Sequence, residues 1–325
     1  MTPGILLMNF GGPPVSDQAT IRRYIENILT DPANWPWRRL RALQPAVART
    51  IAARRAPAVV AQYATMNGGS PLLSISEEQR TLLQQALNGA GARHPIFLGM
   101  QYWPPLIEEV LPQVRSAGLT DLLLLPLYPH DSVATSETCC ERVERWWRLH
   151  GDATVRLHRC TGWYSHPRYI ACCAKLLSFT LSQCEHPAKT TILFTAHGLP
   201  QAIVDGGDPY PHQVRAQIGK ILSEGCLANP WLLGFQSRLG PVRWLTPDIE
   251  PCLKACAALG VRSLCIMPLS FVAEQLETLY EIDVTYVEMA RRFGIAEVRR
   301  VPCANTDPLF IDSLKDLIIG HNYHV

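Results

Sequence analysis

Two segments of the chain carry side chains that could move protons or hold a metal ion. In the first, the apolar run Thr191-Ile-Leu-Phe-Thr-Ala196 ends in His197 and Gly198. The second follows another apolar run and presents a ladder of acids: Glu277, Glu281 and Asp283. A histidine exchanges protons near neutral pH, and imidazole with carboxylate suits a loosely held divalent metal. The two segments therefore predict proton transfer or metal handling where they meet.

Eight apolar runs of strand type alternate with helical stretches and predict the elements that position these residues. The runs cover residues 4–10, 96–102, 121–128, 154–158, 191–196, 231–236, 263–269 and 298–302. Such alternation is typical of a parallel, doubly wound α/β sheet. Because ligands bind at the carboxyl ends of strands in these sheets, His197 is expected at a functional edge.

The first four runs resemble the second four in order and content. Gly118–Leu127 aligns with Gly260–Leu269 at a constant offset, and Gln101 corresponds to Gln236. The chain is therefore predicted to form two similar Rossmann-like domains, each a parallel four-stranded sheet flanked by helices, with the active-site cleft between them. Their predicted ranges are residues 1–170 and 171–325.

Composition limits the class of protein. The 325 residues are 47% hydrophobic and 18% charged, which suffices for two ordinary cores. A net charge of +2 and a pI near 8.0 give no global signature of nucleic-acid binding. Met1-Thr-Pro-Gly4 leads directly into an apolar run, and no apolar segment approaches the roughly 18 residues of a membrane span. We therefore expect a cytoplasmic protein that binds no nucleic acid.

The segment from about residue 32 to 76 is basic and aromatic and holds no acidic residue. Its tryptophans and arginines are Trp35, Trp37, Arg38, Arg39, Arg41, Arg49, Arg54 and Arg55. Two interpretations stay open: a solvated helix with arginine stems lying along the protein, or a lip that contacts an anionic membrane surface or an acidic ligand. The second interpretation predicts peripheral attachment to the inner face of a membrane.

Eleven cysteines invite a disulfide or metal interpretation, yet they fall as adjacent pairs and single residues. No C-x2-C pair is present, and Cys252 and Cys256 lie one helical turn apart without a second pair nearby. The pattern favours reduced, mostly buried thiols.

Seven separated motifs together resemble the ferrochelatase family of bacterial type. They are Asn9–Pro13, Gly69–Leu72, Leu125–Pro129, Ala196–Pro200, Gly207–Tyr210, Gln236–Pro241 and Leu276–Asp283, and they span essentially the whole chain in order. The resemblance implies a chelatase-type fold and a lyase that inserts Fe²⁺ into protoporphyrin IX, releasing two protons, in the terminal step of haem biosynthesis. It implies these two substrates, no tightly bound cofactor, and contact with the preceding enzyme of the pathway.

The resemblance also implies roles for individual residues. His197 becomes the base or metal contact, Glu277 the active-site glutamate, and Glu281 a further metal contact. A pocket for a flat apolar macrocycle is implied at Phe10, Tyr63, Leu72, Tyr102, Gln236, Ser237, Arg238, Trp244 and Phe271, with polar groups at the propionates. Secondary positions in or near the site are Gln275, His166 and Asp283.

The chain departs from the family pattern in four places, one of them Val133, where some relatives have a cysteine. Gln275 stands where a histidine is common, and an amide cannot take a proton near neutral pH. Gln101 precedes Tyr102 where an arginine is often found, and no cysteine cluster ends the chain, so no iron–sulfur cluster is expected. Two alternatives stay open: a porphyrin- or haem-binding carrier or regulatory protein with little chelatase activity, or a chelatase for coproporphyrin III or another divalent metal.

Overall fold

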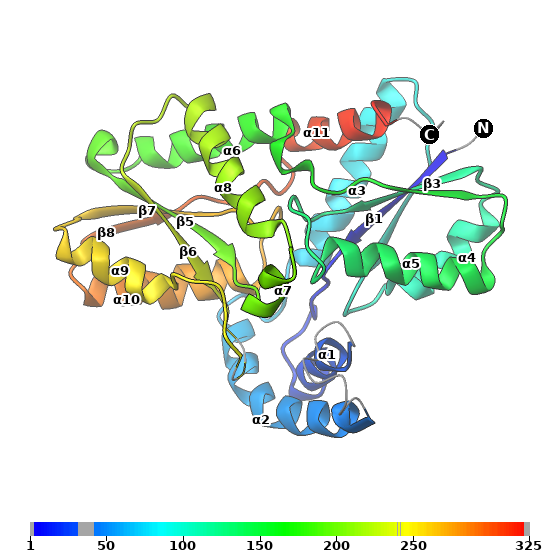
Figure 1. The fold of residues 1–325 in the computed structure, drawn as a ribbon, viewed down its shortest axis with the longest axis horizontal. Coiled ribbons are helices and arrows are strands. Elements are labelled where there is room, and N and C mark those ends of the chain that lie inside the picture. The colour runs from blue at the N-terminus through cyan, green and yellow to red at the C-terminus, as the bar shows by residue number, and fades with distance from the viewer. Residues whose placement is uncertain (1–2, 32–41, 239, 241, 322–325) are drawn as a thin grey trace. The chain divides into compact units, whose positions relative to one another are not determined.

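The computed structural model describes residues 3–31, 42–238, 240 and 242–321, and its contacts divide the chain into two compact units (Figure 1). Unit 1 comprises Met1–Leu127, Val133–Thr161 and Lys315–Val325, and unit 2 comprises Tyr128–Ser132 and Gly162–Leu314. The predicted division after residue 170 falls inside helix α6 (Pro167–Ser182), which groups with unit 2. The last residues of the chain group with unit 1, although they follow unit 2 in sequence.

Unit 1 is built on a parallel sheet with the strand order β2-β1-β3-β4. The strands are β1 (Pro3–Asn9), β2 (Ile96–Met100), β3 (Asp121–Pro126) and β4 (Arg156–Arg159). Its flanking helices α3 (Leu72–Gly89), α4 (Ile107–Ser116) and α5 (Ser136–His150) contact β2 or β3. The leucines and isoleucines of β1 and β3 are buried, which is typical of a parallel sheet covered on both faces.

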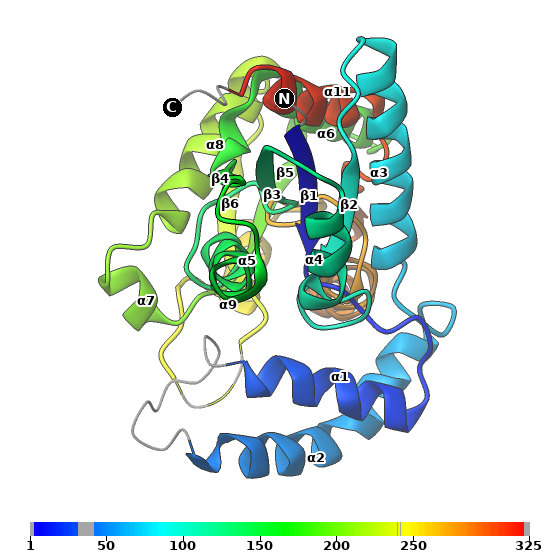
Figure 2. The same cartoon turned by 90° about the vertical axis from the view of Figure 1, so that its right-hand side faces the viewer.

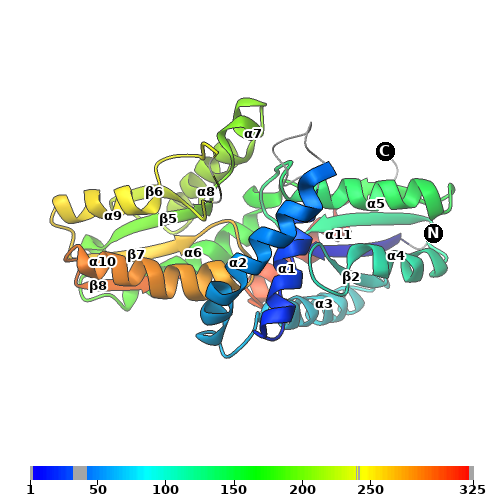
Figure 3. The same cartoon turned by 90° about the horizontal axis from the view of Figure 1, so that it is seen from below.

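Helices α1 (Gln18–Thr30) and α2 (Gln44–Ala64) form a pair that follows the carboxyl end of β1 (Figures 2 and 3). The buried apolar residues of α2 recur at helical spacing and form the inward face of this helix. They are Ala48, Ala52, Ala56, Val59 and Tyr63. Arg49, Arg54 and Arg55 are exposed on α2. The other predicted lip residues, Trp35, Trp37, Arg38, Arg39 and Arg41, lie outside the described residues.

Unit 2 repeats the architecture, with the parallel strand order β6-β5-β7-β8. The strands are β5 (Thr191–His197), β6 (Trp231–Gln236), β7 (Ser263–Pro268) and β8 (Glu297–Arg300). Helices α6 and α8 (Tyr210–Glu224) contact each other on one face of this sheet, and α9 (Ile249–Ala258) and α10 (Val287–Arg292) on the other (Figure 1). The predicted fold class is therefore confirmed.

The remaining elements are α-helices, 3-10 turns and a π-helical segment. They are α7 (Gln201–Asp205), α11 (Pro308–Ile319), the 3-10 turns η3 (Trp163–Ser165) and η4 (Pro187–Lys189), and the π-helical segment η5 (Glu277–Tyr286). The π-helix continues into α10 without a break. Within the described part of the chain, no helix combines the length and apolar character that crossing a membrane would require.

The two sheets match in register as well as in order. Met8 of β1 lies opposite Gly99 and Pro126, and Thr195 of β5 lies opposite Gly234 and Pro268. A cis X-Pro peptide follows β2 at Pro104-Pro105 and β6 at Thr246-Pro247. This correspondence confirms the predicted internal repeat and makes Phe10 the counterpart of His197.

Candidate active site

His197 is held at the carboxyl end of β5 by bonds to its backbone. Its N–H donates to Ser270 Oγ at 3.0 Å, and the Tyr210 hydroxyl donates to its carbonyl oxygen at 2.8 Å. Tyr210 and Ser270 are themselves linked at 2.6 Å, with Ser270 as the donor because the tyrosine proton is already used. The ends of β5, β7 and α8 are thereby fixed around the imidazole.

The imidazole of His197 is oriented by its neighbour. Nδ1 lies 2.7 Å from the Gly198 carbonyl oxygen, which only accepts, so Nδ1 carries the proton and Nε2 is the acceptor. Burial lowers the pKa of His197, against the opposing effects of the Glu281 charge and this hydrogen bond. The Phe271 ring stands perpendicular to the imidazole, 6.3 Å between centroids. The arrangement presents a neutral imidazole at neutral pH.

Gly198 is required by the close approach of β5 and β6. Its N–H donates to Gln236 O at 2.7 Å, and an added Cβ would lie 2.9 Å from that oxygen and 3.2 Å from Trp244 Cε3. Pro200 continues the contact through an antiparallel bridge with Trp244. The His-Gly pair thus combines a reactive side chain with the only residue type that fits behind it.

Glu281 is an anchored carboxylate that accepts four hydrogen bonds. Oε1 accepts from Ser237 N at 3.0 Å and from the Tyr286 hydroxyl. Oε2 accepts from Gln236 Nε2 at 3.1 Å and from Ser237 Oγ. Ser237 has a φ of 66°, an uncommon left-handed conformation for serine, in which its amide and hydroxyl both reach this carboxylate. These four donors fix the position of the Glu281 carboxylate.

Glu277 differs from Glu281 in its surroundings. Burial raises its pKa, a hydrogen bond to its own backbone lowers it, and the nearby Glu281 raises it, which together give a pKa of about 7. Gln236 Nε2 also lies 3.4 Å from the Glu277 carbonyl oxygen, so one amide bridges both residues. The two glutamates of this helix therefore differ: Glu281 is fixed by four donors, and Glu277 can gain or lose a proton near neutral pH.

The sequence did not indicate Tyr286, Tyr210 or Ser270 as parts of this site. In an α-helix, residues five apart point about 140° away from each other, so an α-helical interpretation separates Tyr286 from Glu281. The π-helix links residues i and i+5 and brings them to the same side. Tyr210 lies in the Gly207–Tyr210 motif, which was the available signal. Ser270 is an ordinary loop residue with no signal of its own.

The other predicted residues of unit 2 lie around this centre with varied partners. The Arg238 side chain forms an ion pair with Asp248. Asp283 is bound by Arg300 at 2.7 and 3.0 Å, so it does not extend the Glu281 cluster. Gln275 is buried at the start of the helix, where its backbone exchanges hydrogen bonds with Thr278 Oγ1 at 3.0 Å.

His166 is placed by its backbone. It precedes α6, where its N–H donates to Trp163 O at 2.9 Å and its carbonyl accepts from Ile170 N at 2.9 Å. Both contacts fix the start of a helix, and neither involves the residues around His197. The structure therefore gives His166 a place at a helix terminus.

In unit 1, the residues predicted to bind the macrocycle differ in accessibility. Tyr63, Leu72 and Tyr102 are each 2% exposed, whereas Phe10 is partly exposed. The Phe10 ring meets the Tyr102 ring edge-on at 4.6 Å, and the Tyr102 hydroxyl donates to Asp31 Oδ2 at 3.0 Å. Phe10 therefore presents the accessible ring, with Tyr102 supporting it.

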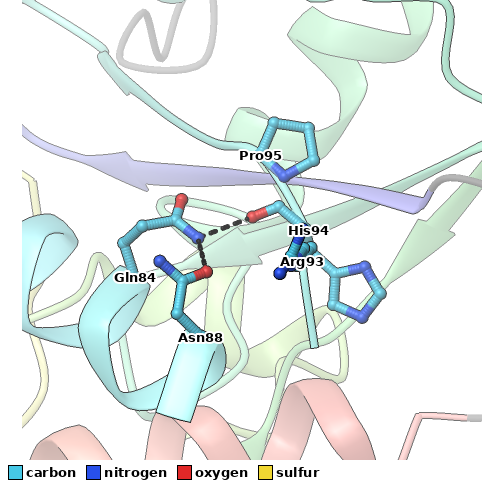
Figure 4. Close-up of a pocket in the computed structure, with 5 residues that line it drawn as sticks. All are labelled: Gln84, Asn88, Arg93, His94 and Pro95. Atoms are coloured by element: carbon cyan, nitrogen blue, oxygen red, sulfur yellow. Dashed lines mark hydrogen bonds between the residues drawn. The ribbon is translucent and has the colours of Figure 1, made fainter. Parts of the chain in front are cut away.

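No preformed metal cage is present among the residues that the structure describes, since no three His, Cys, Asp or Glu side chains gather closely enough to hold an ion. A shallow open pocket of about 490 Å³ lies elsewhere, before the amino end of β2 (Figure 4). It is lined by Gln84, Asn88, Arg93, His94 and Pro95. Gln84 donates there to Asn88 Oδ1 at 3.2 Å and to His94 O at 3.0 Å. It holds no predicted site residue.

Two solved structures that are similar to this chain show which fold the chain has. CbiX, the terminal enzyme of siroheme biosynthesis in denitrifying bacteria, matches with a TM-score of 0.52 at 14% identity, over 98% of this chain and 99% of that one. The sirohydrochlorin chelatase SirB from Bacillus subtilis subspecies spizizenii, in complex with cobalt, gives 0.53 at 8% identity, over 98% and 94%. The chain therefore has the two-unit fold of these chelatases.

Sequence comparison then gives the family. The ferrochelatase family model matches residues 2–322. A ferrochelatase of Synechococcus sp. (strain JA-3-3Ab) is 40% identical over 98% of this chain and 93% of its own length. A ferrochelatase of Rippkaea orientalis is 39% identical over 97% of this chain and 81% of its own length. The chain belongs to the ferrochelatase family.

Proposed function

We propose that this chain inserts Fe²⁺ into a porphyrin and takes up the two protons released from the pyrrole nitrogens. Membership in the ferrochelatase family supports this reaction. The observation that carries it is a neutral imidazole at the end of β5 together with a carboxyl group of pKa about 7 on η5, with Gln236 bonded to Gly198 and to Glu277 between them. Both groups can accept a proton at neutral pH, as the reaction requires.

His197 acts first on the porphyrin nitrogen or on the entering iron. Its Nδ1 is held by Gly198, so Nε2 offers a lone pair in a fixed direction. The lowered pKa keeps that lone pair available at neutral pH. Imidazole binds Fe²⁺ less tightly than a thiolate cage would, which suits an ion that must move on to four pyrrole nitrogens.

Glu277 receives a released proton, and Glu281 lies on the same helix as an anchored neighbour. An acceptor with a pKa near the working pH takes up a proton and returns it to solvent without a large barrier in either direction. Glu281 is held in place by Ser237, Gln236 and Tyr286, which all donate to it. This use of Gln236 and Ser237 supports a role in holding Glu281, in place of the predicted role at a porphyrin carboxylate.

Aromatic surfaces are available for the macrocycle in both units. Phe10 in unit 1, and Phe271 and Trp244 in unit 2, are partly exposed rings of the kind that bind a flat apolar ligand. Tyr63, Leu72 and Tyr102 support these surfaces from the protein interior. Arg238 binds a porphyrin carboxylate by exchanging its present partner Asp248 for the ligand. The cleft between the two units stays a prediction.

No tightly bound cofactor is needed for this reaction. Thiols that could hold an iron–sulfur cluster act as thiolates. Burial raises the pKa of Cys173 to about 12 and that of Cys252 to about 11, which keeps both protonated at neutral pH. Their protonated state supports the interpretation that Cys173 and Cys252 serve as buried packing residues.

Protoporphyrin IX is the proposed porphyrin, and the inner face of a membrane is the proposed location. The α1–α2 pair supports the second proposal, because α2 exposes Arg49, Arg54 and Arg55 and contains no acidic residue. Contact with the preceding enzyme of the haem pathway would supply an apolar substrate directly. Flotation with anionic liposomes at low salt tests the membrane contact, and charge reversal at Arg49 and Arg54 should abolish it.

Anaerobic insertion of Fe²⁺ followed by absorbance tests the proposed reaction. Wild-type protein is given protoporphyrin IX or coproporphyrin III in competition, with Co²⁺ and Zn²⁺ as alternative metals. Turnover with protoporphyrin IX and Fe²⁺ is expected, and Gln275→His should increase it if an imidazole at that position relays protons. Porphyrin binding without turnover would identify a carrier and contradict the proposal.

A further inference from the structure

Arg300, at the carboxyl end of β8, binds two acids that flank the functional part of the helix. Its Nε and Nη2 donate to the two carboxylate oxygens of Asp283 at 2.7 and 3.0 Å, and its Nη1 donates to Glu274 Oε1 at 2.9 Å. Glu274 precedes η5, and Asp283 lies inside it. Glu277 and Glu281 fall between the two anchors, so one guanidinium spans the segment that carries both.

The Arg300 contacts are more enclosed than ordinary surface ion pairs. The side chains of Arg300 and Glu274 are only 11% and 12% exposed, and that of Asp283 is 36% exposed. Glu274 Oε1 also accepts from Cys303 N at 2.9 Å, and Glu274 N donates to Asn305 Oδ1 at 3.0 Å. The loop before the helix is thereby joined to the loop after β8. A planar guanidinium with three occupied donors fixes direction as well as distance.

The helix is held to both edges of the sheet. Gln236 and Ser237, at the end of edge strand β6, hold Glu281, while Arg300, on the opposite edge strand β8, holds Asp283. A helix fixed at one edge alone could turn about its axis, whereas attachment at both edges sets its rotation. That rotation decides where the Glu277 carboxylate lies relative to His197.

An arginine that binds both oxygens of one acid and one oxygen of a second acid is called a fork here. Unit 1 contains the same fork at Arg159, on a helix without the counterparts of Glu277 and Glu281. Arg159 stands opposite Leu124 in β3, as Arg300 stands opposite Ile266 in β7. It binds both carboxylate oxygens of Glu144, at 2.6 and 2.7 Å, and Glu137 at 2.6 Å, both on α5. The fork is therefore part of the repeated scaffold, and unit 2 uses it on the helix that carries Glu277 and Glu281.

We propose that Arg300 is a positioning residue for iron insertion, which fixes η5 so that Glu277 and Glu281 are presented to His197. This inference rests on the proposed function. It predicts that Arg300→Lys, which keeps the charge but loses the planar fork, lowers kcat by about 10- to 100-fold, because small displacements of catalytic groups have effects of this size. The KM for porphyrin should change by no more than about twofold, since Arg300 contacts no proposed porphyrin-binding residue.

Arg159→Lys is the matched control, because it alters the same fork in the other unit. Its kcat should stay within about twofold of wild type, as expected for a more exposed ion pair. Peptide-level hydrogen exchange gives a second readout independent of turnover: Arg300→Lys should increase exchange in residues 276–286 and leave β5 protected. Asp283→Asn should show the same pattern to a smaller degree.

The outcomes separate this inference from the proposed function. A fall in kcat per folded molecule together with faster hydrogen exchange in η5 supports the positioning role of Arg300. Unchanged kcat and exchange in Arg300→Lys overturn it, and so does a loss of kcat that merely follows the unfolded fraction seen by circular dichroism. If wild-type protein inserts no iron, the proposed function fails, and hydrogen exchange alone then decides whether Arg300 fixes η5.

Discussion

The ends of β1 and β5 occupy the same place in two equivalent sheets and carry different chemistry. By register, Phe10 of unit 1 corresponds to His197 of unit 2, and the next residue is glycine in both. Phe10 meets the Tyr102 ring, while His197 lies near the Glu281 carboxylate. In the proposed function, the end of β1 contacts the macrocycle and the end of β5 accepts protons.

The contrast shows that the scaffold and the chemistry are specified separately. Strand order, register, the cis-proline loops and the arginine forks recur in both units. The differences include the α1–α2 pair of unit 1, residues at the carboxyl ends of strands, and one helix that adopts π geometry in unit 2. A repeated fold can therefore divide substrate binding and proton transfer between its two copies.

Truncating the two corresponding residues should affect different kinetic constants: kcat for His197 and KM for Phe10. His197→Ala removes the proposed proton acceptor and should lower kcat by about 10²- to 10⁴-fold. Phe10→Ala removes an accessible ring and should mainly raise the KM for porphyrin, by roughly 10-fold. Steady-state kinetics with both substrates varied separates the two effects.

His158→Ala controls for the loss of any buried imidazole. His158 Nε2 donates to Asp121 Oδ1 at 2.8 Å within unit 1, away from the proposed chemistry. Its loss should lower thermal stability and leave kcat per folded molecule near the wild-type value. Retained turnover in His197→Ala, or an equal loss of kcat in Phe10→Ala, would remove the proposed division of roles.

Glu277→Gln should abolish the rise of kcat with pH that deprotonation of Glu277 produces in the wild-type protein. Burial raises the pKa of Glu277 to about 7, so its proton-accepting form increases as the pH rises through that value. Wild-type kcat should therefore rise between about pH 6 and 8, and the variant should be about 10- to 100-fold slower without this rise. If kcat of the variant still rises over this pH range, another titrating group is responsible for the rise.

Much of this contrast could be predicted from the sequence, because strands and motifs leave local signals. Apolar runs located all eight strands, and the Ala196–Pro200 motif located His197 at a strand end. The partners of Glu281 could not be predicted, since Tyr286 reaches it only in a π-helix and Ser237 only at positive φ. Neither geometry has a residue pattern that distinguishes it from an α-helix or a strand end.

The role of Arg300 was hidden for a different reason. Its fork joins β8 to residues that lie 17 and 26 positions earlier in the chain. Sequence spacing shows pairs within one helix or strand, whereas this contact depends on which strand becomes the edge of the sheet. Asp283 was consequently grouped with Glu281, although the two residues have different partners.

The stability of Glu277→Gln should depend on pH in the direction set by the same raised pKa. The pKa of Glu277 rises from 4.5 to about 7 on folding, so the folded state binds more proton between these values and loses stability as the pH increases. Glutamine does not titrate, so the variant should gain up to roughly 3 kcal/mol relative to wild type at pH 8 and almost nothing below pH 4.5. Urea unfolding at both pH values measures the difference. An equal effect at both would contradict burial as the cause.

Corresponding glycines of the edge strands should differ in how well they tolerate a methyl group. A Cβ on Gly99 would lie 3.0 Å from Ile107 Cα, whereas a Cβ on Gly234 would lie 2.7 Å from Ile249 Cδ1. The shorter contact is with the far end of a flexible side chain, and the longer one is with helix backbone. Gly99→Ala should therefore destabilise its unit by about 1–3 kcal/mol, and Gly234→Ala by less.

Chemical denaturation together with hydrogen exchange in β2 and β6 tests the order of these two effects and shows which unit is affected. Distance alone predicts the opposite order, because the contact at Gly234 is shorter. If Gly234→Ala proves more destabilising, the side chain of Ile249 is held as firmly as the backbone of Ile107. The two sheets would then be equally rigid where their helices approach, and the contrast between the units would be limited to the residues at the carboxyl ends of their strands.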